Sequence, residues 1–346
     1  MRRTPVTGLA EVTGTPTGLS GLVSNKKCLG LALFASLGGV LYGYNQGVFS
    51  QVQVMADFEH RFASTLNNST AKGLLTRILE LGAMLGALSS SPLADKFSRK
   101  AGVALQVGAT NDVAYIYSGR WFAGMGVGGL SVIVPTFNAE LAPPSIRGTL
   151  VGLQQVAICL GIMVSYWIGY GTNYIGGTTY PQQSSAAWRI PLALQLVPAI
   201  VLCIGSWFLP YSPRWLMLVR REEESLAVLA RLRNQNTSSP EVQYEYLSLK
   251  VGAYADRETS RLRYGTETKT WRTEVLEYKR IFTTNVLLHR VGLGAGVQAF
   301  GQWSGINAII YYAPTIFAQV GLSGGSIGLL ATGVVGILMF VFTIPG

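Results

Sequence analysis

The sequence has few charged residues, histidines and cysteines for its length. Of its 346 residues, 13% are charged, two are histidine and three are cysteine, and the mean hydropathy is +0.33. Ordinary soluble domains are less apolar, so a membrane protein is the first interpretation. Cys28, Cys159 and Cys203 show no metal-site spacing, and we expect buried thiols. His60 and His289 lie at the edges of apolar segments, outside any Ser/His/Asp or Cys/His constellation, so we expect no enzyme, no metal and no cofactor.

The charges lie between apolar stretches of about 20 residues, the length that crosses a ~30 Å hydrocarbon core. Basic residues precede the first stretch, follow the second and fourth, and number 13 from Arg214 to Arg280. The segment from Gln51 to Ala71 has one arginine, and the segment from Thr172 to Ala187 has no basic residue. By the positive-inside rule, this alternation places the N-terminus in the cytoplasm. It also accounts for the net charge of +10 without a nucleic-acid partner.

The apolar stretches predict an all-α membrane protein. The expected spans are Cys28 to Ser50, Gly73 to Leu93, Ala101 to Ser118, Gly119 to Glu140, Thr149 to Tyr170, Trp188 to Leu209, Asn285 to Val320 and Gly325 to Gly346. The predicted organisation is a disordered cytoplasmic tail (1–27), an N-terminal transmembrane half (28–209), a cytoplasmic loop with short amphipathic helices (210–284) and the start of a second transmembrane half (285–346).

The third predicted span is the weakest of these. It contains Asn111 and Asp112, and a carboxylate near a span centre costs about 3 kcal/mol. Lys100 and Arg147 both belong on the cytoplasmic side, so an even number of crossings must fit into the 46 residues between them. Either two short helices cross there or one helix is missing, and we expect Asp112 in an outer loop.

The seventh predicted span is rich in glycine up to Gly305 and is interrupted by Pro314. Such a pattern favours a discontinuous helix, which transporters place at the substrate site near the bilayer midplane. Close packing of helices through glycine is the alternative.

Six short motifs occur in order along the chain. They are GVLYGYNQG from Gly39, LADKFSRK from Leu93, GRWFAGMGVG from Gly119, ELAPPSIRG from Glu140, PYSPRW from Pro210 and QWSGINA from Gln302. In these motifs the chain resembles the sugar porters of the major facilitator superfamily, most closely the fungal monosaccharide and quinate branch, over Leu29 to Gly346. The resemblance implies two halves of six spans that rock against each other to move a substrate. It also implies a monomer in the plasma membrane, with a small sugar and the lipid bilayer as partners.

The resemblance further implies charge clamps at the cytoplasmic helix ends, which form and break as the halves rock. The candidate residues of this gate are Asp95, Arg99, Lys100, Arg120, Glu140, Arg147 and Arg214. The alternative is that basic residues only hold loops inside, and for Lys96 and Arg231 we prefer it.

A sugar offers hydroxyl groups and no charge, so its site needs neutral amides and an aromatic wall. The candidate substrate-binding residues are Gln155, Gln302, Asn307, Tyr311 and Tyr312. In the family, the amides matching the first three bind the hexose. Gln154 is the neighbour of Gln155, and helical spacing does not choose between them. Trp167 and Trp303 are candidates for stacking on the sugar ring, or for packing and lipid contact.

Two departures from the family concern the substrate. Gly301 precedes Gln302 where a Gln-Gln pair is usual, and Met339 stands where the best-known hexose carriers have an asparagine. A pocket with fewer amides is less specific for hexose, which keeps quinate, pentoses and polyols open.

A third departure concerns energy coupling. Asn45 stands where proton-coupled relatives carry an aspartate. A carboxylate inside the bilayer can bind and release a proton, whereas an amide cannot titrate. Outside the gate motifs we identify Asp112 as the only other acid in the spans. The sequence therefore predicts facilitated diffusion.

The chain is shorter than the family pattern. It reaches only about the eighth span and lacks most of the third, after Lys100, so we expect a truncated copy of a longer transporter. The alternatives are a proton-coupled quinate, polyol or pentose transporter, and a non-transporting sensor-like or inactive relative.

The predicted orientation can be tested by glycosylation. Asn67 and Asn68 form overlapping sequons in the predicted outer loop, and Asn236 forms one in the predicted cytoplasmic loop. We expect a glycosidase-sensitive gel shift that the combined Asn67→Gln and Asn68→Gln substitutions abolish and Asn236→Gln leaves unchanged. A glycan at Asn236 with none at the other two positions would reverse the orientation.

Overall fold

The computed structural model describes residues 25–88, 113–143, 145–265, 276, 279–321 and 325–344. All regular elements in these ranges are helices, which confirms the predicted all-α class. The chain divides into two compact units, each described by itself below. Unit 1 is Met1–Leu209 with Ile310–Gly346, and unit 2 is Pro210–Ile309. The predicted four-segment organisation stays a prediction.

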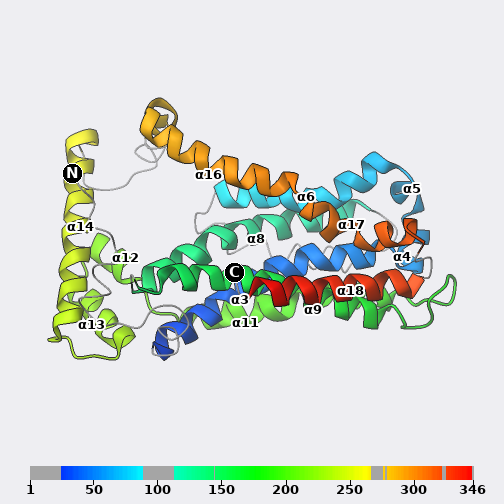
Figure 1. Ribbon diagram of the computed structural model, residues 1–346, viewed down its shortest axis with the longest axis horizontal. Helices are drawn as coiled ribbons and strands as arrows, with labels where there is room; N and C mark the ends of the chain where they lie inside the picture. Colours follow the sequence, from blue (N-terminus) through cyan, green and yellow to red (C-terminus); the bar gives the residue numbers. More distant parts are fainter. Residues whose placement is uncertain are drawn as a thin grey trace. The chain divides into compact units, whose positions relative to one another are not determined.

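Unit 1 is a bundle of long helices that run side by side (Figure 1). Its long helices are α3 (Lys26–Val52), α6 (Ser69–Leu88), α8 (Ala114–Leu141), α9 (Arg147–Thr172) and α18 (Gly325–Thr343). Its shorter elements are α4 (Ala56–Arg61), α5 (Ala63–Leu66), α10 (Ala186–Leu194), α11 (Leu196–Gly205) and the 3₁₀ helix η1 (Ser206–Phe208). The helix α17 (Ile306–Gln319) begins at the end of unit 2 and contributes its remaining residues to unit 1.

Five segments in the described residues are long and apolar enough to cross a membrane. They are Lys26–Val52, Ala114–Leu141, Arg147–Thr172, Ala186–Phe208 and Ser326–Thr343. Helix α6 is not among them because it carries three charged residues, Lys72, Arg77 and Glu80.

The third predicted span is only partly described, and its boundary with the fourth differs from the structure. Most of the third, 101–112, lies outside the described residues. The predicted boundary between Ser118 and Gly119 is wrong, because α8 already begins at Ala114 and no helix-breaking residue stands between them. The predicted break in the seventh span is confirmed: α16 (Asn285–Trp303) ends before Gly305, whose φ of 79° lies in the left-handed region.

Glycine allows the closest helix contacts of unit 1. A Cβ atom added to Gly128 of α8 would collide with the backbone of Ala83 in α6, and one added to Gly86 of α6 would collide with the backbone of Met125 in α8. Backbones that approach this closely gain dispersion contacts, which drive helix association where no water is expelled.

Two buried tyrosine hydroxyl groups donate to carbonyl groups of neighbouring helices, and one of them replaces the helical donor that a proline lacks. Pro314 has no N–H for the carbonyl of Ile310 in α17, and the Tyr166 hydroxyl of α9 donates to that oxygen at 2.8 Å. The Tyr44 hydroxyl of α3 donates to the carbonyl of Pro191 in α10 at 2.9 Å. Both tyrosines are buried, so each bond satisfies a group that no water reaches.

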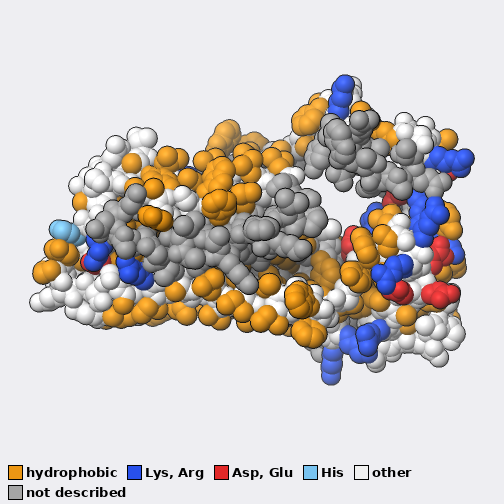
Figure 2. Space-filling view, turned by 180° about the vertical axis from the view of Figure 1, so that it is seen from behind, with side chains coloured by type: hydrophobic (Ala, Val, Ile, Leu, Met, Phe, Trp, Pro, Cys, Tyr) orange, Lys and Arg blue, Asp and Glu red, His pale blue; other side chains and the backbone are white. Residues whose placement is uncertain are grey.

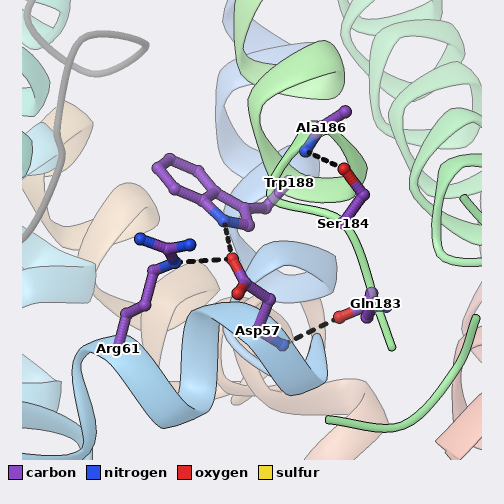
Figure 3. Close-up of polar contacts among 6 residues, drawn as sticks. All are labelled: Asp57, Arg61, Gln183, Ser184, Ala186 and Trp188. Atoms are coloured by element: carbon purple, nitrogen blue, oxygen red, sulfur yellow. Dashed lines mark hydrogen bonds and ion pairs between the residues drawn. The ribbon is translucent and has the colours of Figure 1, made fainter. Parts of the chain in front are cut away.

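A buried carboxylate joins three segments at the α4 end of the bundle (Figure 3). The Asp57 carboxylate accepts from Trp188 Nε1 at 2.9 Å and from Arg61 Nε at 2.8 Å. The Asp57 backbone N–H donates to the Gln183 side chain at 2.9 Å. The Trp188 ring is fully buried and meets Phe58 edge to face at 5.5 Å. This cluster fixes the chain between α9 and α10 against α4.

Unit 2 is polar and charged. It contains α12 (Pro213–Leu218), α13 (Glu222–Arg233), α14 (Pro240–Tyr264) and α16, so α14 is longer than the short helices that we predict. Three glutamates open α13 and two arginines close it, which complements the helix dipole. The hydrogen-bonded ammonium of Lys250 lowers the pKa of Glu222. Lys, Arg, Asp and Glu are concentrated on unit 2, whereas hydrophobic side chains cover much of the visible described surface of unit 1 (Figure 2).

The close contact between α6 and α8 predicts the effect of one added methyl group. Gly128→Ala should destabilise the protein by about 1–3 kcal/mol through overpacking, although alanine is the better helix former. Gly73→Ala in α6 meets no atom within 4 Å and should leave stability unchanged or slightly raised. Thermal unfolding of the purified variants in detergent checks this, and equal midpoints for the two variants would contradict it.

Candidate functional site

Four of the seven predicted gate residues lie in the described part of the chain, and each is reported in its own unit. Asp95, Arg99 and Lys100 lie outside the described residues. Glu140 lies at the α8 end near the start of α3, where Cys28 Sγ donates to the Leu141 carbonyl at 3.2 Å. Between described residues there is no ion pair of Glu140 with the exposed Arg147.

Arg120 does not share a helix end with Glu140. It lies near the other end of α8, about 30 Å from Glu140 along the helix axis. Its Nε donates to the Leu75 carbonyl at 3.0 Å and its Nη2 to the Thr76 carbonyl at 3.1 Å. Its guanidinium lies over the Phe49 ring at 3.8 Å, and the residue is 1% exposed. Arg120 therefore ties α8 to the backbone of α6 and the ring of α3.

Arg214 lies in unit 2 and pairs with Asp256 of α14 at 3.6 Å. Both side chains are more than half exposed, so the pair contributes little to stability. The motif around it starts α12: the Ser212 hydroxyl caps the helix by accepting from Trp215 N at 3.4 Å, and Pro213 takes the first turn.

The structure separates Gln154 from Gln155. Gln154 is buried against α3, where its side chain lies next to Gly39. Gln155 is exposed, and its amide nitrogen approaches Cys159 Sγ at 3.8 Å. Cys159 Sγ in turn lies 3.3 Å from the Thr343 hydroxyl of α18. Gln155 thus lies on the α18 side of α9 with a weak sulfur partner.

Gln302 and Asn307 belong to unit 2 and lie on either side of the helix break. The Asn307 amide donates to the Gln302 side-chain oxygen, so the break brings the two predicted amides together. Trp303 is 82% exposed and meets Phe300 edge to face at 5.7 Å.

The predicted aromatic pair splits into two environments. Tyr312 is half-buried, whereas Tyr311 is 1% exposed and its hydroxyl donates to Glu80 Oε1 at 2.6 Å. Glu80 Oε1 also accepts from Gln46 Nε2 at 3.0 Å, and Glu80 Oε2 accepts from the Tyr42 hydroxyl at 3.5 Å.

Glu80 is the residue that our sequence analysis missed. It lies within the predicted span from Gly73 to Leu93, so our statement that Asp112 is the only other acid in the spans is wrong. The signal was an ionisable side chain inside an apolar stretch. Asp112 itself lies outside the described residues.

The remaining predicted positions have structural contacts. Asn45 is 3% exposed and donates to the Leu41 carbonyl of its own helix at 2.9 Å. Met339 of α18 packs in the cluster that contains Tyr166. The Trp167 ring lies next to Gly333 of α18, where an added Cβ atom would be 3.3 Å from it. Trp167 is therefore partly a packing residue between α9 and α18.

The candidate modification and metal residues have simple environments. Asn67 and Asn68 are exposed, and the Asn68 side-chain oxygen caps α6 by accepting from Thr70 N at 3.0 Å. Cys203 is exposed on α11, contrary to the expectation of a buried thiol, because its face of that helix is not packed. Within the described ranges no group of three His, Cys, Asp or Glu side chains is arranged to hold a metal ion.

The fold and the six motifs agree with a known family. A family profile described as "Sugar (and other) transporter" matches residues 31–346. The chain belongs to this family. Among solved structures, this family member matches the proton:xylose symporter XylE of the major facilitator superfamily bound to 6-bromo-6-deoxy-D-glucose, with a TM-score of 0.71 and 26% identity over 92% of the chain and 68% of XylE. The partially occluded inward-open XylE from E. coli matches with a TM-score of 0.67. The fold is that of the major facilitator superfamily.

Its curated relatives include fungal carriers. The family member is 33% identical to a probable quinate permease of Aspergillus niger, over 91% of the chain and 59% of the relative. It is 34% identical to the MFS glucose transporter mfs1 of Aspergillus flavus, over 90% of the chain and 58% of the relative. The chain thus spans about three fifths of the length of these relatives.

The two carbonyl bonds of Arg120 predict that lysine cannot replace it. Arg120→Lys keeps the charge but loses the fork that reaches both carbonyls and the planar stack on Phe49, so stability should fall by about 1–3 kcal/mol. Arg231→Lys, on an exposed position of α13, is the matched control. Unfolding midpoints in detergent provide the measurement, and an Arg120→Lys midpoint equal to wild type would refute the clamp.

Proposed function

We propose that the transporter to which this chain belongs carries a monosaccharide-like solute across a membrane by alternating access. The observation that carries the proposal is the pair of neutral amides at the helix break, Gln302 and Asn307, whose side chains bond to each other. Gln155 on α9 is a further neutral amide, described by itself in unit 1. Neutral amides donate and accept hydrogen bonds without charge, which suits the hydroxyl groups of a sugar.

The helix break supports a moving site. Gly305 separates α16 from α17, and a broken helix exposes backbone groups that regular helices hide. The two sides of such a break can reorient while each helix stays intact. Gln302 and Asn307 would then follow the substrate, because their mutual hydrogen bond can be exchanged for bonds to a hydroxyl group.

A hydroxylated carboxylate such as quinate is the second candidate substrate. The name of the Aspergillus niger relative favours it. A cation is also present in unit 1: the exposed Arg77 guanidinium lies 5.4 Å from the centre of the Tyr311 ring. An anionic substrate needs such a charge, whereas a neutral sugar does not.

The remaining features of the proposal concern placement in the cell. We propose a cytoplasmic N-terminus, because the basic residues follow the positive-inside pattern. A monomer in the plasma membrane is proposed from the family alone. We propose that Glu140 and Arg147 take part in closing the cytoplasmic side, with Arg120 as a fixed clamp at the other end of α8.

Uptake by a host without its own sugar carriers tests the substrate. Labelled glucose, fructose, xylose and quinate are supplied in parallel, and we expect saturable uptake of a monosaccharide. Gln155→Ala should raise its KM about tenfold, which corresponds to about 1.4 kcal/mol for a lost hydrogen bond. Gln182→Ala, which removes an exposed amide from the chain between α9 and α10, is the control. Uptake of quinate alone would favour the second candidate, and equal KM values for both variants would remove Gln155 from the site.

A further inference from the structure

The Glu80 carboxylate of α6 is an ionisable group to which the proposed function gives no role. It lies in an apolar helix of unit 1 and is half-buried. Among the described residues no Lys or Arg side chain forms an ion pair with it. A carboxylate in this position carries a desolvation cost, and its retention calls for a function.

The direct partners of Glu80 are neutral donors from two other helices. Tyr311 of α17 makes the shortest bond, at 2.6 Å, and Gln46 of α3 follows at 3.0 Å. Tyr42 of α3 completes the set at 3.5 Å and also accepts from Gln46 Nε2 at 3.3 Å. The carboxylate therefore links three helices, and none of its direct partners neutralises its charge.

Two cations lie nearby without pairing with the carboxylate. Arg77, on the same helix, lies over the Tyr311 ring at 5.4 Å. Arg120 of α8 interacts with Glu80 electrostatically, but its guanidinium is bonded to the carbonyls of Leu75 and Thr76. Neither guanidinium forms an ion pair with the carboxylate, so neither occupies the place of a proton on its oxygens.

We propose that Glu80 is a proton-binding site whose occupancy is linked to the Tyr311 hydrogen bond, and hence to the position of α17 against α6. Burial favours the neutral carboxyl group, and donors favour the ionised one. Protonation removes the negative charge that strengthens the bond from the Tyr311 hydroxyl, so it weakens the hold on Tyr311.

The second tether of α17 does not titrate. The Tyr166 hydroxyl donates to the Ile310 carbonyl at 2.8 Å, next to Tyr311 in the chain. Residues 310 and 311 thus bind α9 through a proton-insensitive bond and α6 through a proton-sensitive one. Protonation of Glu80 releases one side of α17 and leaves the other side held.

This site changes the prediction of facilitated diffusion. Asn45 cannot titrate, but Glu80, on the neighbouring helix, can. If the proposed transport function holds, α17 carries residues of the substrate site, so proton binding at Glu80 and substrate movement are coupled. Proton binding itself does not depend on that function.

Infrared difference spectroscopy of the purified protein in lipid nanodiscs tests the proton site without any transport. The difference between wild-type spectra recorded at about pH 5 and at about pH 9 should contain the carbonyl band of a protonated carboxylic acid. Glu80→Gln should remove the band, and Glu223→Gln, an exposed glutamate of α13, should leave it. Tyr311→Phe should keep the band and shift its frequency, because the carboxyl group loses the hydrogen bond from the Tyr311 hydroxyl.

A second experiment measures the coupling. Uptake by wild type and Glu223→Gln should fall when a protonophore dissipates the proton gradient. Uptake by Glu80→Gln should show no response to the gradient, whatever its rate. The absence of a carboxylic-acid band that depends on Glu80, or an unchanged band frequency in Tyr311→Phe, overturns the proposal. An unchanged gradient response in Glu80→Gln also overturns it. No uptake by any form would instead count against the transport function, while the infrared band still decides the proton site.

Discussion

The absence of water around the helices of unit 1 governs the rest of its structure. Each polar group in a span needs a partner within the protein, because lipid offers none. The pairing of Tyr166 with the Ile310 carbonyl, of Arg120 with two carbonyls of α6 and of Asp57 with Trp188 all meet this demand. These bonds also hold particular helices next to each other. The hydrogen bonds that satisfy the polar groups therefore also determine how the helices pack.

Glycine solves the complementary problem of attraction between apolar helices. Lipid tails are as apolar as the side chains, so helices gain by close contact rather than by expelling water. Gly86 and Gly128 let α6 and α8 touch through their backbones. That contact places the carbonyl groups of Leu75 and Thr76 next to the guanidinium of Arg120. It also places Glu80, on the same helix, next to its partners in α3 and α17. The close packing of α6 against α8 thus positions the polar groups around Arg120 and Glu80.

The sequence alone predicted those features that depend on the local pattern of residues. Hydropathy and length predicted the five described segments that are long and apolar enough to cross a membrane, and the glycine run predicted the break at Gly305. The six motifs found the family. It could not choose between Gln154 and Gln155, because neighbours on a helix differ only in the face they present, and that choice depends on where α3 packs. Glu80 was readable as an acid in an apolar stretch, but its bond to Tyr311 joins residues 231 positions apart. Only the folded chain shows that pairing.

The bond from Tyr166 to the Ile310 carbonyl has an evolutionary consequence. The tyrosine hydroxyl stands in for the N–H that Pro314 lacks, so the two positions share one acceptor. A residue with an N–H at position 314 would give the carbonyl a helical donor and make the hydroxyl redundant. The buried Tyr166 hydroxyl would then need a different acceptor for its hydrogen bond. Substitutions at positions 166 and 314 are thus epistatic, and tolerated sequences should change them together.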